Sequence, residues 1–75
     1  MASGIYRYDV LKTVRAFNGK EITLETVTLY NDYDETVAWQ RFTDGEFGFG
    51  DSITMYVFVN VNGQDQLFRC YERTK

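Results

Sequence analysis

Two Asn-Gly pairs, Asn18-Gly19 and Asn62-Gly63, constrain the fold of this chain more than any other feature. Each pair lies between runs that are rich in β-branched and aromatic residues, which favour strands. Asn and Gly tolerate the positive φ angles that both central residues of a two-residue type I′ turn adopt. The pairs therefore predict two β-hairpins, which join residues 5–17 to 20–30 and residues 52–61 to 64–73.

The short loop of the second hairpin predicts its register. A two-residue loop places Val57 opposite Phe68 and Met55 opposite Cys70, so that all four side chains point to one apolar face. On that face Cys70 would pack as a small, inert hydrophobic residue. The opposite face then carries side chains that we expect to bind a partner, namely Tyr56, Phe58, Leu67, Arg69, Tyr71 and Arg73.

The apolar alternation in the first hairpin slips by one position within its second strand. Ile22 and Leu24 share one face, whereas the next apolar residue, Val27, is out of phase with them. A β-bulge adds one unpaired residue and returns the later side chains to the core. The pattern predicts a bulge near Glu25-Thr26.

The segment between the hairpins favours a helix. Asp32 followed three residues later by Glu35 fits a capping box, in which each side chain binds a free backbone amide at the helix start. The pattern predicts a helix over residues 33–43 that ends at Asp44-Gly45. Three apolar residues fall on one stripe of that helix: Ala38, Trp39 and Phe42.

The element order β-β-α-β-β predicts a single α+β domain over residues 1–75. A spatial strand order of 2-1-3-4 makes a four-stranded, wholly antiparallel sheet, with a right-handed crossover through the helix on one face. Residues 53–61 form the central strand and are apolar on both faces, although one helix covers only one face. The alternative is that residues 36–43 form another strand in a small all-β barrel.

Negative charge is concentrated in the middle of the chain. The whole chain has a net charge of −3, whereas residues 32–51 carry six carboxylates and one arginine, for a net charge of −5. Carboxylates along a helix and a loop can imitate a nucleic-acid backbone and occupy the basic groove of another protein. These candidate partner-binding residues are Asp32, Asp34, Glu35, Asp44, Glu46 and Asp51.

The chain is poor in groups for catalysis or metal binding. It contains no His and one Cys, and it offers no nucleophile beside a clear base. We therefore expect no enzymatic activity, no metal site and no cofactor. The chain also has no basic and apolar leader and no apolar run long enough to span a bilayer, so we expect a cytoplasmic protein without membrane contact.

These features predict a small, non-enzymatic protein-binding module that uses the acidic helix-loop surface, the aromatic sheet face or both. Small size, acidity and missing catalytic groups are typical of phage-encoded viral proteins that inhibit host enzymes. The expected partner is therefore a protein, such as a nucleic-acid-binding enzyme. Two alternatives stay open for the sheet face: stacking of single-stranded nucleic acid, which the net negative charge opposes, and formation of a homodimer.

Overall fold

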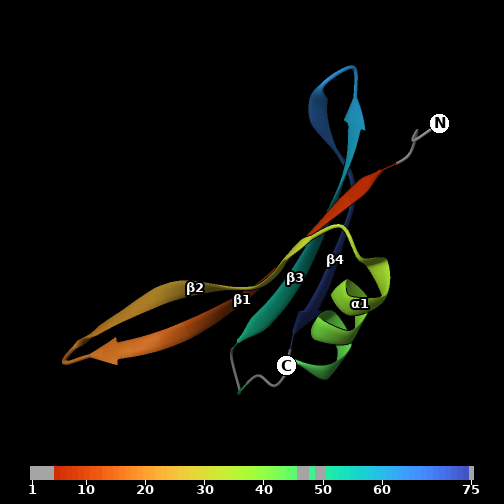
Figure 1. Cartoon of the computed structure of the whole chain (residues 1–75). Helices are drawn as coiled ribbons and strands as arrows, with labels where there is room; N and C mark the ends of the chain where they lie inside the picture. The colour runs from red at the N-terminus through yellow and green to blue at the C-terminus, as the bar shows by residue number, and fades with distance from the viewer. Residues whose placement is uncertain (1–4, 46–47, 49–50, 75) are drawn as a thin grey trace.

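The computed structural model describes residues 5–45, 48 and 51–74. Its strands form one antiparallel sheet in the order β2-β1-β3-β4, and the helix lies on one face (Figure 1). The sheet is open, with β2 and β4 at its edges, so the predicted fold is confirmed and the barrel alternative is wrong. The five elements are β1 (Tyr6–Asn18), β2 (Glu21–Asp32), α1 (Glu35–Asp44), β3 (Ser52–Val61) and β4 (Gln64–Thr74).

The Asn62-Gly63 pair forms the predicted hairpin turn, whereas the first turn lies one residue later than predicted, at Gly19-Lys20, because Asn18 pairs with Glu21. Asn62 and Gly63 have φ angles of 53° and 83°, and Gly19 has a φ angle of 67°. Most side chains with a Cβ are strained in this left-handed region, whereas Gly has no Cβ and Asn has a short polar side chain that tolerates it. Both hairpins therefore follow from local turn chemistry.

The bulge in the first hairpin is at Leu29. Val10 is opposite Tyr30 and Leu11 is opposite Thr28, which leaves Leu29 as the extra residue. The prediction of a bulge near Glu25-Thr26 is wrong, because both residues pair in regular register. At this bulged position, the Leu29 side chain packs against the core. The out-of-phase position of Val27 needs no bulge at residues 25–26, because the β2 side chains that pack against the core are Leu29 and Tyr30.

A second bulge lies in β4, at Phe68. Phe58 is opposite Leu67 but Val57 is opposite Arg69, so the predicted pairs Val57–Phe68 and Met55–Cys70 are wrong. The loop-derived register holds only between the turn and the bulge. Beyond it, the extra residue moves each following side chain to the other face. Tyr71 and Arg73 therefore face the helix, whereas Cys70 is exposed on the opposite face.

The helix begins two residues later than predicted. Asp34 is the N-cap, and its side chain accepts a hydrogen bond from the Val37 amide at 3.2 Å. Asp32 is not the cap because it pairs with Tyr8 and therefore belongs to β2. The helix ends as predicted near Gly45, whose amide donates to the Arg41 carbonyl at 3.2 Å.

The core lies between α1 and the helix-facing side of the two central strands. Trp39 packs against its edge, together with Leu29 from the bulge of β2. This confirms the predicted helical stripe and the side of the sheet that it covers. The buried side chains of the described residues are Tyr8, Val10, Ala38, Phe42, Ile53, Met55 and Val57.

The helix covers only part of its face of the sheet. It approaches β1, β2 and β3, but within the described chain no helix Cα lies within 8 Å of a Cα in β4. Side chains bridge this gap instead: Trp39 of the helix and Tyr71 of β4 have ring centroids 4.9 Å apart. A groove between α1 and β4 is the consequence.

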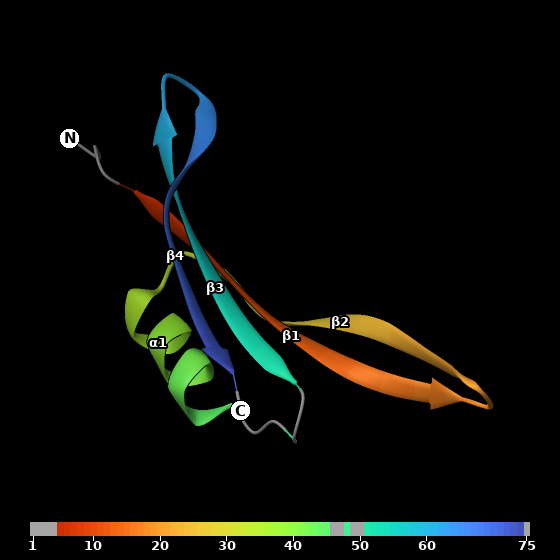
Figure 2. The same cartoon turned by 180° about the vertical axis from the view of Figure 1, so that it is seen from behind.

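The first hairpin extends beyond the body of the molecule as a ribbon. β1 pairs with β3 only as far as Thr13, so residues 14–25 of β1 and β2 pair only with each other (Figure 2). This projection makes the molecule elongated, with extents of 53 × 23 × 15 Å. We call residues 14–25 the β1–β2 ribbon.

Candidate functional site

The two sets of predicted binding residues are each divided by the structure. Of the sheet-face set, Tyr56, Phe58 and Leu67 lie on the face opposite the helix, which we call the open face. Arg69, Tyr71 and Arg73 lie on the helix face instead. The predicted single aromatic and basic patch is therefore wrong, because the bulge at Phe68 reverses the facing of the residues after it.

The open face is partly covered by its own side chains. Tyr56 and Phe58 have ring centroids 6.3 Å apart, and the Arg7 guanidinium carbon lies 4.5 Å from the centroid of Phe58. Arg7 is held there by a hydrogen bond of 3.2 Å to Asp65 and one of 3.3 Å to Asn31. Its donors are thus largely used within the chain, which lowers its value as a ligand for phosphate.

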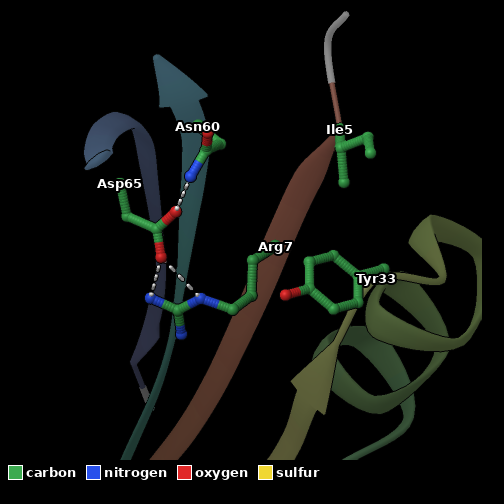
Figure 3. Close-up of a pocket in the computed structure, with 5 residues that line it drawn as sticks. All are labelled: Ile5, Arg7, Tyr33, Asn60 and Asp65. Atoms are coloured by element: carbon green, nitrogen blue, oxygen red, sulfur yellow. Dashed lines mark hydrogen bonds and ion pairs between the residues drawn. The ribbon is translucent and has the colours of Figure 1, made fainter. Parts of the chain in front are cut away.

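A hollow of about 490 Å³ lies at the end of the open face near the start of β1 (Figure 3). Its polar groups bind one another: Arg7 pairs with Asp65, and the Asn60 amide donates to the other carboxylate oxygen of Asp65 at 3.2 Å. Tyr33 points its hydroxyl into the hollow, and Ile5 forms its apolar rim (Figure 3). The charged and amide side chains of the hollow are therefore already paired with one another.

Asp9 lies nearer the middle of the open face, opposite Tyr56 on β3 and Asn31 on β2. Its Oδ1 atom is buried and has no hydrogen-bond partner within the described part of the chain. An unpartnered buried oxygen costs about 1–3 kcal/mol. Asp9 Oδ1 is thus a buried acceptor on the open face whose hydrogen-bonding capacity the described residues do not use.

The groove between α1 and β4 is the most aromatic site of the described chain. Trp39 forms edge-to-face contacts with Tyr71 at 4.9 Å and with Phe42 at 5.6 Å. On the opposite wall, Tyr6 and Phe68 have ring centroids 5.4 Å apart. The groove has a volume of about 280 Å³. Its lining consists of Tyr6, Tyr8, Glu35, Trp39, Val57, Phe68, Arg69 and Tyr71.

Two opposite charges line this groove, Glu35 and Arg69. Glu35 in the first turn of α1 accepts a hydrogen bond from the Tyr8 hydroxyl at 3.2 Å through Oε2. Burial and the charge of Glu35 raise the pKa of Tyr8, so this hydroxyl stays protonated and holds the carboxylate in place. Arg69 lies on the β4 wall, with its guanidinium carbon 5.3 Å from the centroid of Phe68.

The acidic set is divided between the two ends of α1. Asp32, Asp34 and Glu35 lie at its start, whereas Asp44 is its last residue. Since a helix of ten residues is about 15 Å long, these carboxylates form two separate surfaces. Asp51 lies beyond the helix end, and the predicted residue Glu46 lies outside the described residues.

Several acidic side chains have local structural roles. Asp34 caps the helix, and the Asp51 carboxylate accepts hydrogen bonds from the amides of Gly48 at 2.9 Å and Arg15 at 3.4 Å. Asp32 accepts from the adjacent Tyr33 amide at 2.9 Å but stays exposed, as does Glu35. Asp32 and Glu35 are therefore the acidic residues of this end that are available to a partner.

Sequence reasoning missed the groove, although one signal of it was present. Leu67 and Phe68 are adjacent apolar residues that break the alternation of β4, and such a break is typical of a bulge. A bulge there turns Tyr71 toward Trp39. The sequence around Tyr6 and Tyr8 contains no comparable signal, because no local sequence pattern indicates that α1 leaves β4 uncovered.

No family model, curated relative or solved structure matches the chain. Within the described ranges, no group of three or more His, Cys, Asp or Glu side chains could hold a metal ion. No helix in the described residues is long and apolar enough to cross a membrane.

Proposed function

We propose that this chain is a small, non-enzymatic module that binds a basic surface of another protein. The observation that carries the proposal is that the exposed Glu35 lines the aromatic groove between α1 and β4, while the exposed Asp32 is opposite the groove residue Tyr8 in the sheet. Aromatic side chains and charge complementarity are the usual means by which a small surface gains both affinity and orientation. The chain's net charge of −3 favours a basic partner.

A basic partner of this kind fits the inhibitor function that the sequence suggests. A protein that binds nucleic acid presents a positive groove, and an acidic module in that groove would exclude the nucleic acid. We therefore propose a viral inhibitor of a nucleic-acid-binding enzyme as the specific form of the function. We place its action in the cytoplasm, where the exposed thiol of Cys70 would stay reduced.

The test compares two double substitutions that remove the same charge at different places. Asp32→Asn with Glu35→Gln neutralises the end of α1 beside the groove, whereas Glu21→Gln with Glu25→Gln neutralises the exposed ribbon. We expect the first variant to lose capture of partners from a nuclease-treated lysate of the native host, and the second to retain it. Equal capture by both variants would contradict the proposed surface.

A homodimer is a second candidate because of the β1–β2 ribbon. Phe17, Ile22 and Leu24 lie on one face of the ribbon and are 75%, 56% and 69% exposed. An isolated two-stranded ribbon is marginal in water, and a second copy could cover these side chains. We expect light scattering to detect a dimer that Leu24→Asp disrupts. Monomers in both proteins would rule out this candidate.

Binding of single-stranded nucleic acid has the least support. The residues expected to stack bases and bind phosphate are divided between the two faces, and Arg7 on the open face is already paired with Asp65. A titration with single-stranded DNA at low salt tests it. Binding that Tyr56→Ala abolishes would favour this function over the protein-binding proposal.

A further inference from the structure

The groove between α1 and β4 combines a carboxylate with rings in a way that suits one class of ligand. The faces of aromatic rings are electron-rich and attract cations, and they do so more strongly where water is excluded. The lining offers Tyr6, Trp39 and Tyr71 as rings and Glu35 as the counter-charge. We propose that this groove receives an arginine side chain from the partner protein, with the guanidinium bound to Glu35 and stacked on the rings.

This inference rests on the proposed function, since it names the group of the basic partner that enters the site. The size of the groove is compatible with it: about 280 Å³ holds one long side chain but not a folded segment. The carboxylate of Asp32 is exposed and is opposite the groove residue Tyr8 in the sheet, so it adds negative potential on this side of the molecule.

Glu35 has the free hydrogen-bonding capacity that the ligand needs. Its Oε2 atom accepts from Tyr8, whereas within the described chain Oε1 has no hydrogen bond. An arginine presents several donors in one plane, so it can bind this carboxylate and still lie flat against a ring. A lysine ammonium can bind the carboxylate but cannot stack in the same way. The site should therefore prefer arginine over lysine.

Two arginine side chains of the protein already place their guanidinium groups against aromatic rings. Arg7 is 4.5 Å from the centroid of Phe58, and Arg69 is 5.3 Å from the centroid of Phe68. Arg69 belongs to the groove and makes no ion pair within the described residues. As a like charge it weakens the binding of an incoming cation, while it would strengthen the binding of an anion. The sign of its effect therefore identifies the charge of the ligand.

Trp39 provides the measurement, because it is the single Trp of the chain and lies in the wall of the groove. The probe is N-acetyl-arginine amide, and its neutral counterpart is N-acetyl-citrulline amide, which has almost the same shape. Both are titrated at constant ionic strength while the Trp39 fluorescence is recorded. We expect a saturable change with the arginine probe at millimolar concentrations, and binding of the citrulline probe weaker by about tenfold.

Three variants separate this site from general charge effects. Glu35→Gln should weaken binding of the arginine probe about tenfold, since it removes the counter-charge but keeps an acceptor for Tyr8. Glu21→Gln removes an equal charge in the exposed β1–β2 ribbon and should leave binding unchanged. Arg69→Gln should tighten binding about threefold, because it removes the like charge.

The outcomes distinguish this inference from the proposed function. Equal binding of the citrulline probe, an unaffected Glu35→Gln variant or weaker binding by Arg69→Gln would each overturn the arginine site. If the arginine probe fails while partner capture still depends on Asp32 and Glu35, the protein-binding function stands and only the arginine site is wrong.

Discussion

At the scale of single residues, neighbouring carboxylates at the start of α1 have different roles. Asp32 ends β2, Asp34 caps the helix, and Glu35 receives the hydroxyl of Tyr8. The sequence pattern places an acidic cluster here but does not say which member binds which group. The difference arises because strand pairing extends to Asp32 and so delays the helix by two residues.

Replacing Asp34 with Ala should destabilise the protein by about 0.5–2 kcal/mol, because the Val37 amide then loses its acceptor. Asp32→Ala should cost less, since Asp32 binds only the adjacent Tyr33 amide at an exposed position. Chemical denaturation of both variants provides the comparison. A larger loss for Asp32→Ala would favour the cap that the sequence predicted.

Replacing Tyr8 with Phe should reduce stability by about 0.5–1.5 kcal/mol near neutral pH, because the hydrogen bond to Glu35 is lost. The pKa of Tyr8 is raised above its usual 10.0, so the unfolded chain releases this proton first. The contribution of Tyr8 is therefore complete below pH 10.0 and is lost as the pH rises through the folded pKa.

Urea denaturation of wild type and Tyr8→Phe at neutral and strongly alkaline pH tests this prediction. The stability difference between the two proteins should shrink at high pH. The comparison isolates Tyr8 because the two proteins differ only at this residue. A difference that does not change with pH would show that Tyr8 has the same pKa in both states.

At the scale of elements, the bulge at Phe68 decides which residues form the candidate site. Without it, Cys70 would lie under the helix and Tyr71 on the open face, as the loop length predicts. With it, Tyr71 contacts Trp39 and Phe42, and Arg73 donates a hydrogen bond to the Phe42 carbonyl near the helix end. The bulge thus gives α1 an aromatic contact and a cation at its C-terminal end.

The reactivity of Cys70 tests this register. Cys70 is exposed, so a thiol reagent should modify it in the native protein at a rate within about tenfold of the rate in urea. The urea-denatured chain is the control. Slow modification in the native state would support the predicted register, in which the thiol is buried beside Met55.

At the scale of the whole molecule, the buried side chains that stabilise the fold and the exposed apolar side chains belong to different parts of the chain. Among the described residues, the buried side chains belong to α1 and to the strands beneath it, whereas the β1–β2 ribbon exposes Phe17, Ile22 and Leu24. The ribbon therefore contributes little to the folding stability of a single copy of the chain. Its residues are available for contact with another molecule, as is the groove between α1 and β4.

Substitutions at Met55 and Leu24 test this difference between the buried core and the exposed ribbon. Met55 is fully buried and Leu24 is 69% exposed. Met55→Ala should cost about 2–5 kcal/mol, because it leaves a cavity in the core. Leu24→Ala should change the unfolding free energy by less than about 0.5 kcal/mol at low protein concentration. A concentration-dependent loss for Leu24→Ala would show that a second copy covers the ribbon.

The sequence alone determined the features that depend on neighbouring residues. The two hairpin turns (to within one residue for the first), the stripe of Ala38, Trp39 and Phe42, and the strand order that follows from short antiparallel connections are of this kind. Tertiary packing decided the positions of both bulges and of the N-cap. The bulge at Phe68 in turn decided the side of the sheet on which each later residue of β4 lies. Pairing across strands has a period of two, so one extra residue that improves a distant contact reverses every later side chain.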